Sequence, residues 1–264
     1  MARLTGVDVT VFSVGGASVL EDLRGATVKA ETQFADVTPL ILAGKSNRAV
    51  KQSVAIEGAL TSTKTGGQKV THLDVSLLQV AGFDYRSVTE KCRFEGRITH
   101  EDGSGIGDEW AVPVAVQKDY KAQVELSVDP SAGAGLVSTA LGSLAGKPIG
   151  FAVTINGVTV AVPMALAKFE HRIQPGSRQI WVVDLTGSAL VGFSYPTSPT
   201  GSGTLLEHCF NSPGIALPIA VLAGSGQPQV SGDFLVSRFG FQVTNAGAVE
   251  SAYSFASTGE VALS

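Results

Sequence analysis

The stretch Phe151–Val162 reads FAVTINGVTVAV and places apolar residues at alternating positions on both sides of an Asn-Gly pair. Alternation with a period of two is typical of a strand that buries one face. Asn-Gly between two such runs is the strongest short-range signal for a two-residue hairpin turn. We therefore predict a β-hairpin here. A second one is predicted at Val9–Val19, where Gly15-Gly16 separates two alternating runs.

Strand patterns extend over most of the chain, and turn signals separate them. The further predicted strands are Thr27–Thr32, Lys51–Ile56, Val88–Ile98, Trp110–Val116, Ala122–Val128, Ala167–Ile173, Gln179–Leu185, Phe234–Val243 and Val249–Ser257. Helix signals are few: Leu73–Ala81 and Leu205–Phe210 each predict a short helix, and Leu136–Ala145 is interpreted as a short helix or a linker. Many strands with few short helices predict a mainly β fold, a sandwich or a barrel.

The two halves of the chain contain matching segments in the same order. Val9–Val19 matches Ala152–Val162, Lys29 matches Lys168, Arg48 matches Arg178, Gly58 matches Gly187, and the helix at 73–81 matches that at 205–210. The separation falls from 139 residues between the lysines to 130 between the arginines, so the second copy lacks part of the connection at 34–46. We expect two tandem, duplicated β-sandwich or barrel domains, each with a short helix. They cover 1–130 and 147–264, with a small-residue linker at 131–146.

Composition excludes several classes of protein. Of 264 residues, 44% are hydrophobic and 16% are charged, which is too apolar for a disordered chain. The net charge of −4 does not suggest a nucleic-acid-binding surface. No apolar run reaches the roughly 20 residues of a membrane span. The N-terminal residues lack an export signal, so we expect a protein made in a cytoplasm-like compartment.

Charge is unevenly distributed between the halves. Residues 1–130 hold 31 charged side chains, whereas residues 131–264 hold 11. If the halves share one fold, their charge must follow from what each of them faces. We therefore expect the second copy to be the more deeply covered one in an assembly.

No residue pattern predicts catalysis, a metal site or a cofactor site. Two cysteines exclude a disulfide scaffold, and both Cys92 and Cys209 are interpreted as core thiols. The four histidines lack the spacing of a zinc site. Ala43–Ser46 resembles the end of a phosphate-binding loop, but Pro39 occupies the position of its first glycine. We therefore expect a protein that is not an enzyme.

The C-terminal region carries a resemblance to a known family. Val230–Phe239 reads as a penultimate strand, and Ala248–Val261 as a small turn followed by a final strand. That strand ends in a Phe-x-x-x-Gly phrase, Phe255 to Gly259. This run resembles the tail tube proteins of long-tailed bacteriophages. The family usually has one domain per chain, so this chain resembles its duplicated-domain type.

The resemblance implies a structural role in a virion tail, assembled in the host cytoplasm. Its expected partners are further copies of itself, three chains to a ring, together with tape measure and tail terminator or tip proteins. Stacked rings would form a tube through which DNA passes without sequence-specific binding. No cofactor, metal or membrane is implied.

Two other classes stay open on the sequence. A capsid decoration protein, or another assembly or adhesion protein built from tandem β-sandwiches, fits the strands equally well. An enzyme on a β-barrel scaffold would have to use Asp102, Asp108 or Glu109, for which no nucleophile–base pair is legible.

Two segments are candidates for contacts between rings. The first is the apolar run Thr38, Pro39, Leu40, Ile41, Leu42 and Ala43, since an exposed apolar patch usually marks an interface. The alternative is a strand or a loop that covers the core. The second candidate is the polar tip Asp102, Gly103, Ser104 and Gly105.

We expect the variant in which Leu40, Ile41 and Leu42 are all replaced by Ser to be a soluble, folded protein that forms no tubes, because the apolar contact between rings is lost. Electron microscopy and circular dichroism measure the two properties. Tubes of normal length from this variant would show that the segment is not the contact.

Overall fold

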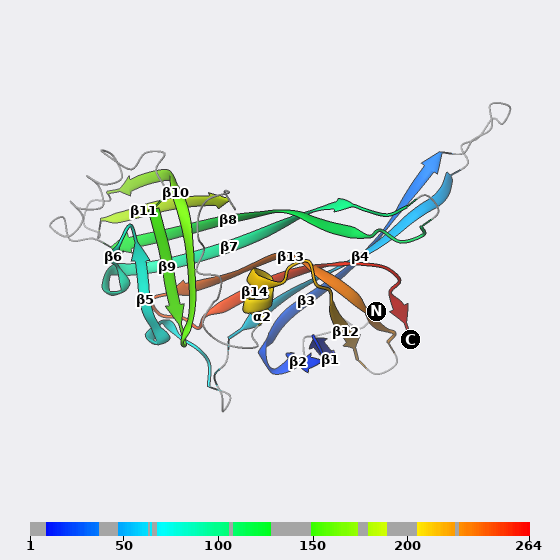
Figure 1. Ribbon diagram of the computed structural model, residues 1–264. Helices are drawn as coiled ribbons and strands as arrows, with labels where there is room; N and C mark the ends of the chain where they lie inside the picture. Colours follow the sequence, from blue (N-terminus) through cyan, green and yellow to red (C-terminus); the bar gives the residue numbers. More distant parts are fainter. Residues whose placement is uncertain are drawn as a thin grey trace.

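Antiparallel strands make up most of the computed structural model (Figure 1), which describes residues 9–36, 47–62, 64, 68–105, 108–127, 149–173, 179–188, 205–224 and 227–264. The strands form four successive units, and each unit is a short strand followed by a long hairpin. The mainly β fold that the alternation predicts is confirmed.

The first two units each contain an additional short strand and a 3-10 turn before the hairpin. The first unit comprises β1 (Val9–Val14), β2 (Ala17–Ser18), η2 (Leu20–Asp22), β3 (Leu23–Asp36) and β4 (Asn47–Thr61). After η3 (His72–Asp74), the second comprises β5 (Val75–Val80), β6 (Phe83–Asp84), η4 (Arg86–Val88), β7 (Thr89–Asp102) and β8 (Pro113–Ser127).

The last two units run without these additions. The third unit comprises β9 (Ile149–Ile155), β10 (Val158–Arg172) and β11 (Ile180–Ser188). The helix α2 (Leu205–Asn211) precedes the fourth, which comprises β12 (Leu217–Ala223), β13 (Gln229–Thr244) and β14 (Glu250–Ser257). The short strand β15 (Ala262–Leu263) ends the chain and pairs with β13.

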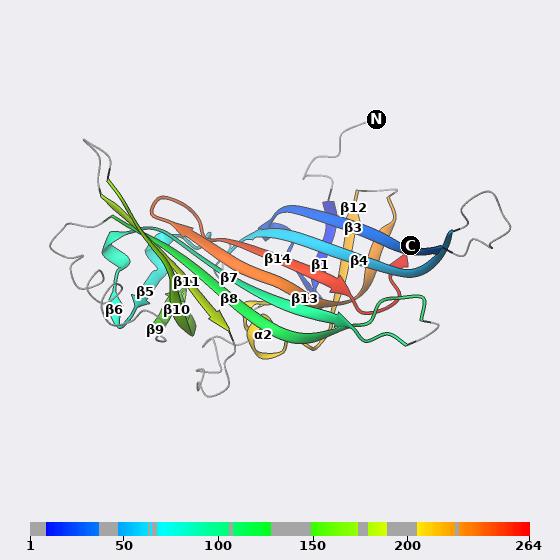
Figure 2. The same ribbon diagram turned by 90° about the horizontal axis from the view of Figure 1, so that it is seen from above.

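The long strands make one continuous sheet, the long sheet, in the order β3-β4-β14-β13-β7-β8-β11-β10. Every neighbouring pair in it is antiparallel. The short strands pair separately, β1 with β12 and β5 with β9. These two pairs are separated along the direction of the long strands, and α2 lies between them (Figures 1 and 2). They cover one face, which we call the inner face; the other is the outer face.

A bulge marks the place where each unit enters the long sheet. Strand pairing shifts register at Leu23/Gly25 in β3, Thr89/Lys91 in β7, Leu166/Lys168 in β10 and Val236/Arg238 in β13. A bulge bends a strand and increases its twist, and strands that pass from one sheet to another turn the corner in this way. The four units therefore share their local geometry as well as their order.

Three of the units begin with the same tight turn. Backbone φ is positive at both turn residues: 62° and 80° at Gly15-Gly16, 53° and 87° at Ala81-Gly82, and 48° and 80° at Asn156-Gly157. Positive φ at both central positions is the hairpin geometry that Asn-Gly favours. The two hairpins predicted from such pairs are confirmed.

The predicted helix at Leu73–Ala81 is wrong. The segment contains only the end of η3 and then the strand β5, whose buried residues Leu78 and Val80 alternate with more exposed ones. Two-residue periodicity and the pairing with β9 outweigh the helix signals there. The second predicted helix is confirmed as α2.

Two tandem domains are not confirmed, because the halves interleave. Within the described strands, no pair joins the first unit to the second or the third to the fourth; β4–β14, β13–β7, β8–β11, β1–β12 and β5–β9 all join one half to the other. The strand order has a two-fold relation. If β3 is exchanged with β10, β4 with β11, β7 with β13 and β8 with β14, and the order is then reversed, the same order of the long sheet results. This two-fold relation joins β1–β4 with β9–β11, as the sequence matches of these segments do. The predicted match of the helix at 73–81 with that at 205–210 is wrong, because the first segment is β5 and the second is α2.

An aromatic cluster forms the centre of the core on the inner face. Phe94 packs against Phe241 and Phe151 with ring centroids 5.4 Å and 5.9 Å away, and Phe210 of α2 lies 4.9 Å from Phe239. The Nζ atom of Lys118 donates a hydrogen bond to the Phe210 carbonyl at 3.1 Å, which ties β8 to the end of α2. Cys92 and Cys209 are fully buried, as predicted, and burial raises the pKa of Cys92 to about 12.

We expect fragments 1–130 and 147–264 to be unfolded or aggregated when each is expressed alone, because each leaves the partner strands of the other half unpaired. Co-expressed, they should form a complex with the circular dichroism spectrum of the intact chain. A cooperative thermal transition in either isolated fragment would contradict the interleaved topology.

We expect Ala81→Gly to stabilise the fold by about 1 kcal/mol, since left-handed backbone geometry costs a residue with a Cβ about that much. The melting temperature should rise by roughly 2–4 °C. Ala59→Gly, at an ordinary exposed strand position, is the control and should destabilise by about 0.5–1 kcal/mol. Equal signs for the two changes would refute the turn assignment.

Candidate assembly surfaces

The long sheet ends in two strands that each have an open edge. Among the described residues, β3 pairs only with β4, and β10 between Ala165 and Arg172 pairs only with β11. Both faces of β3 are exposed from Arg24 to Gln33. Unpaired strand edges present rows of N–H and C=O groups that can pair with another chain. The two edges are therefore candidate assembly surfaces.

The outer face of the long sheet is polar and carries charges of both signs. Ion pairs on it join Lys29 to Glu57 (2.7 Å), Arg238 to Glu95 (2.7 Å), Arg93 to Glu95 (3.2 Å), Lys168 to Glu170 (2.7 Å) and Arg172 to Glu170 (2.8 Å). Arg172 and Lys168 lower the pKa of Glu170 to about 2, so its carboxylate stays charged at neutral pH. Exposed pairs contribute only about 0–1 kcal/mol each to stability. Their main effect is to offset part of the positive charge of this face.

The β3–β4 hairpin extends beyond the rest of the sheet as an arm (Figures 1 and 2). Strand β14 covers the edge of β4 only from Ala55 to Thr61. Beyond Ala55, the turn between β7 and β8 reaches β4 instead. Gln52 N–H donates to the Glu109 carbonyl at 3.0 Å, Ala111 N–H donates to the Gln52 carbonyl at 3.1 Å, and Trp110 forms a parallel bridge with Gln52.

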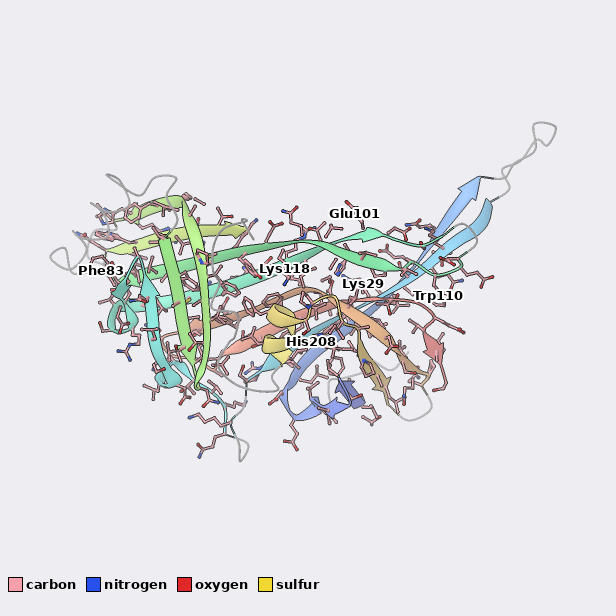
Figure 3. The ribbon with its side chains drawn as sticks, viewed as in Figure 1. Lys29, Phe83, Glu101, Trp110, Lys118 and His208 are labelled. Atoms are coloured by element: carbon pink, nitrogen blue, oxygen red, sulfur yellow. The ribbon has the colours of Figure 1, made fainter. Side chains whose placement is uncertain are left out.

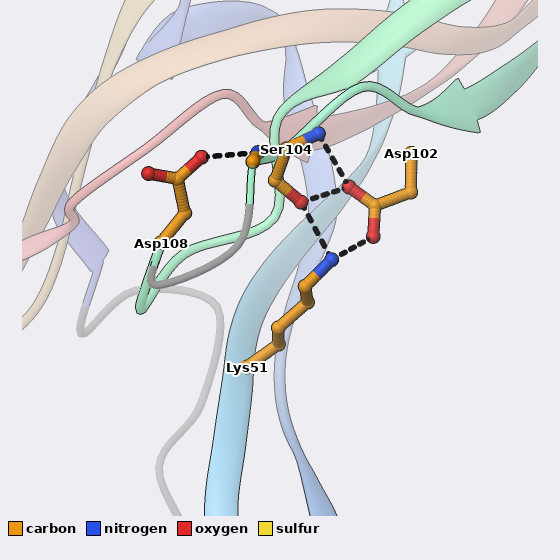
Figure 4. Close-up of polar contacts among 5 residues, drawn as sticks. Lys51, Asp102, Ser104 and Asp108 are labelled. Atoms are coloured by element: carbon orange, nitrogen blue, oxygen red, sulfur yellow. Dashed lines mark hydrogen bonds and ion pairs between the residues drawn. The ribbon is translucent and has the colours of Figure 1, made fainter.

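Side chains strengthen this contact (Figure 4). The Lys51 ammonium pairs with the Asp102 carboxylate and donates to Ser104 Oγ at 2.6 Å. Ser104 N–H donates to Asp102 Oδ1 at 3.0 Å, and Gly105 N–H donates to Asp108 Oδ2 at 2.6 Å. The hydrogen bond from Lys51 is the main cause that holds the pKa of Asp102 well below its usual range, so the ion pair persists into acid conditions.

The predicted polar tip therefore has partners within its own chain. Asp102 and Ser104 contact Lys51, while Gly103 N–H donates to the Val112 carbonyl at 2.9 Å. Lys51 and Gln52 were not recognised from the sequence, because no local pattern indicates a partner some 51 residues away. The predicted apolar segment Thr38–Ala43 lies outside the described residues.

Exposed apolar side chains occur near both tips of the long strands. Val112, Val114 and Val116 are exposed and follow Trp110 in the chain, and Trp110 lies near the arm, whereas the exposed Phe83 lies at the far side of the molecule (Figure 3). An apolar cavity of about 270 Å³ lies between the short-strand pairs, next to α2; its walls include Val153, Val160, Leu206 and Tyr253.

The described residues contain no group of three His, Cys, Asp or Glu side chains placed to hold a metal ion. Of the two tryptophans, Trp181 is buried in β11, and Trp110 is half-buried against the core. As far as the structure describes the chain, its helical segments are too short or too polar to cross a membrane.

Comparisons with known proteins do not identify a family for this chain. No protein-family model and no curated protein matches the chain. Among solved structures, a chain of the "Virion of native gene transfer agent (GTA) particle" is 11% identical, with coverage of 72% of this chain and 96% of that one. Its TM-score of 0.19 does not establish a shared fold.

Proposed function

We propose that this protein is a virion structural protein whose copies join edge to edge into rings, and that stacked rings form the tail tube through which DNA is delivered. The observation that carries the proposal is the pair of open edges at the two ends of one continuous sheet. A protein that stayed a monomer would gain from covering such edges, whereas ring closure removes them.

The directions of the end strands suit a ring. The long sheet has eight alternating strands, so β3 and β10 run in opposite directions. A rotation about an axis along the strands brings the β3 of a second copy beside β10 without reversing it. The new pair is then antiparallel, like every other pair in the sheet. Such a contact uses two different edges of the same chain, and a suitable rotation closes it into a ring.

Three chains are the number that we propose for one ring. The two-fold relation gives each chain two equivalent four-stranded parts, β3-β4-β14-β13 and β10-β11-β8-β7, so three chains supply six such parts. Barrels of about 16–18 strands already leave an aqueous channel. Three eight-stranded sheets would enclose a wider one.

The outer face suits the lumen of such a tube. Several of its basic side chains are paired with carboxylates, as in Lys29–Glu57 and Arg238–Glu95. Free lysines and arginines would bind DNA phosphates and slow the passage of the genome. These pairs reduce the number of basic side chains that are free to do so. Tape measure and tail terminator or tip proteins would be the other partners, and assembly would take place in the host cytoplasm.

A capsid decoration protein remains the alternative. It would also be a β-rich virion component, but it would bind capsid subunits and would not polymerise by itself. Electron microscopy of the purified protein over a concentration series separates the two proposals. Rings and tubes support the tail tube, whereas monomers at every concentration contradict it.

We expect Val28→Lys combined with Ala30→Lys to abolish ring formation, because charged side chains on an edge strand oppose pairing with another chain. Both positions are exposed, so the variant should unfold at the wild-type temperature. Ala252→Lys, on the interior strand β14, is the control and should still form rings. Rings of wild-type diameter from the edge variant would refute edge pairing through β3.

A further inference from the structure

We propose that the turn between β7 and β8 is a brace that holds the β3–β4 arm in the direction required for contact between rings. The brace consists of Asp102, Ser104 and Trp110, and it acts on Lys51 and Gln52 of the arm. This inference rests on the proposed function, because a contact between rings exists only if rings form.

The arm needs support where it leaves the sheet. From Ala55 to Thr61, β4 lies between β3 and β14. Val54 N–H still donates to Ser257 Oγ at the end of β14, at 2.9 Å. Beyond Val54 the arm is a two-stranded ribbon, and an isolated two-stranded hairpin is at best marginally stable in water. Its direction is therefore set by whatever contacts its base.

The brace supplies a β-bridge to a third segment at that place. Gln52 exchanges two backbone hydrogen bonds with the segment Glu109–Ala111, at 3.0 Å and 3.1 Å. Trp110, at the centre of that segment, is half-buried and packs against the core. A bulky aromatic anchored in this way limits how far the segment, and the arm bonded to it, can move.

The side-chain part of the brace is better placed than an ordinary surface ion pair. The Lys51 side chain is 24% exposed and that of Asp102 is 45% exposed. Lys51 has a second acceptor in Ser104, and the backbone N–H of Ser104 fixes the Asp102 carboxylate. An ion pair whose partners are already oriented loses less side-chain entropy than a mobile one.

The brace also connects two parts of the sheet. The arm belongs to the first unit, whose hairpin pairs with β14 of the fourth, whereas the brace belongs to the second unit, which pairs with β11 of the third. The long sheet joins these parts through β13 and β7. The brace adds a connection far from that pair, at the end of the molecule where the arm protrudes.

Hydrogen exchange and electron microscopy of the full chain test the proposal together. In Lys51→Met and Trp110→Ala, we expect exchange at the Gln52 amide to rise by about tenfold or more, because its hydrogen bond opens locally. Rings should keep their wild-type diameter, while tubes should be absent or much shorter. Trp110→Phe should largely restore both properties.

Arg86→Met is the matched control, since Arg86 also forms an ion pair, with Asp84 at 2.7 Å, but lies on neither end strand of the long sheet and does not contact the brace. It should leave exchange at Gln52 and tube length unchanged. Unchanged exchange in both brace variants would overturn the proposal. Normal tubes from a variant with raised exchange would overturn it as well. If wild-type protein forms no rings, the proposed function fails, and the exchange comparison alone decides whether the brace holds the arm.

Discussion

The pairing of β7 with β13 is the contact on which the architecture depends. It joins two four-stranded parts into one sheet, and two glycines allow the close approach. A Cβ at Gly96 would lie 2.3 Å from the Phe239 ring, and one at Gly240 would lie 2.4 Å from the Phe94 carbonyl oxygen. Without this pair the long sheet would divide into two sheets with four open edges. With it, the long sheet, as far as the structure describes the chain, has its open edges at β3 and β10.

Interleaving changes the meaning of the uneven charge. The sequence suggests a highly charged domain followed by a sparsely charged one, with the second more deeply covered. In the structure each part of the long sheet combines one unit from each half, so neither half has a surface of its own. Much of the charge of the first half lies on the long hairpins β3–β4 and β7–β8, in pairs such as Lys29–Glu57 and Arg93–Glu95. The charged residues are therefore concentrated on the outer face and the arm, and not on one domain.

Local patterns predict most strands of this fold, and long-range order is what they miss. Alternation locates the strands, and Asn156-Gly157 locates a turn, because both signals depend on neighbouring residues. Ala81-Gly82 makes the same turn, but the sequence predicts a helix that ends there, because a glycine after an apolar run is also a helix stop signal. Nothing local indicates that β4 pairs with β14, or that Lys51 meets Asp102. Those contacts depend on how whole units pack. The open edges at β3 and β10 are defined by the strand order of the long sheet, which no local pattern predicts.

The claim that copies join through the ends of the long sheet is tested most directly by a three-dimensional electron microscopy reconstruction of the assembled wild-type protein. We expect three chains in a ring, with β10 of each chain antiparallel to β3 of the next and the outer face lining the lumen. An assembly in which both edges face solvent, or in which the inner face lines the lumen, would contradict it.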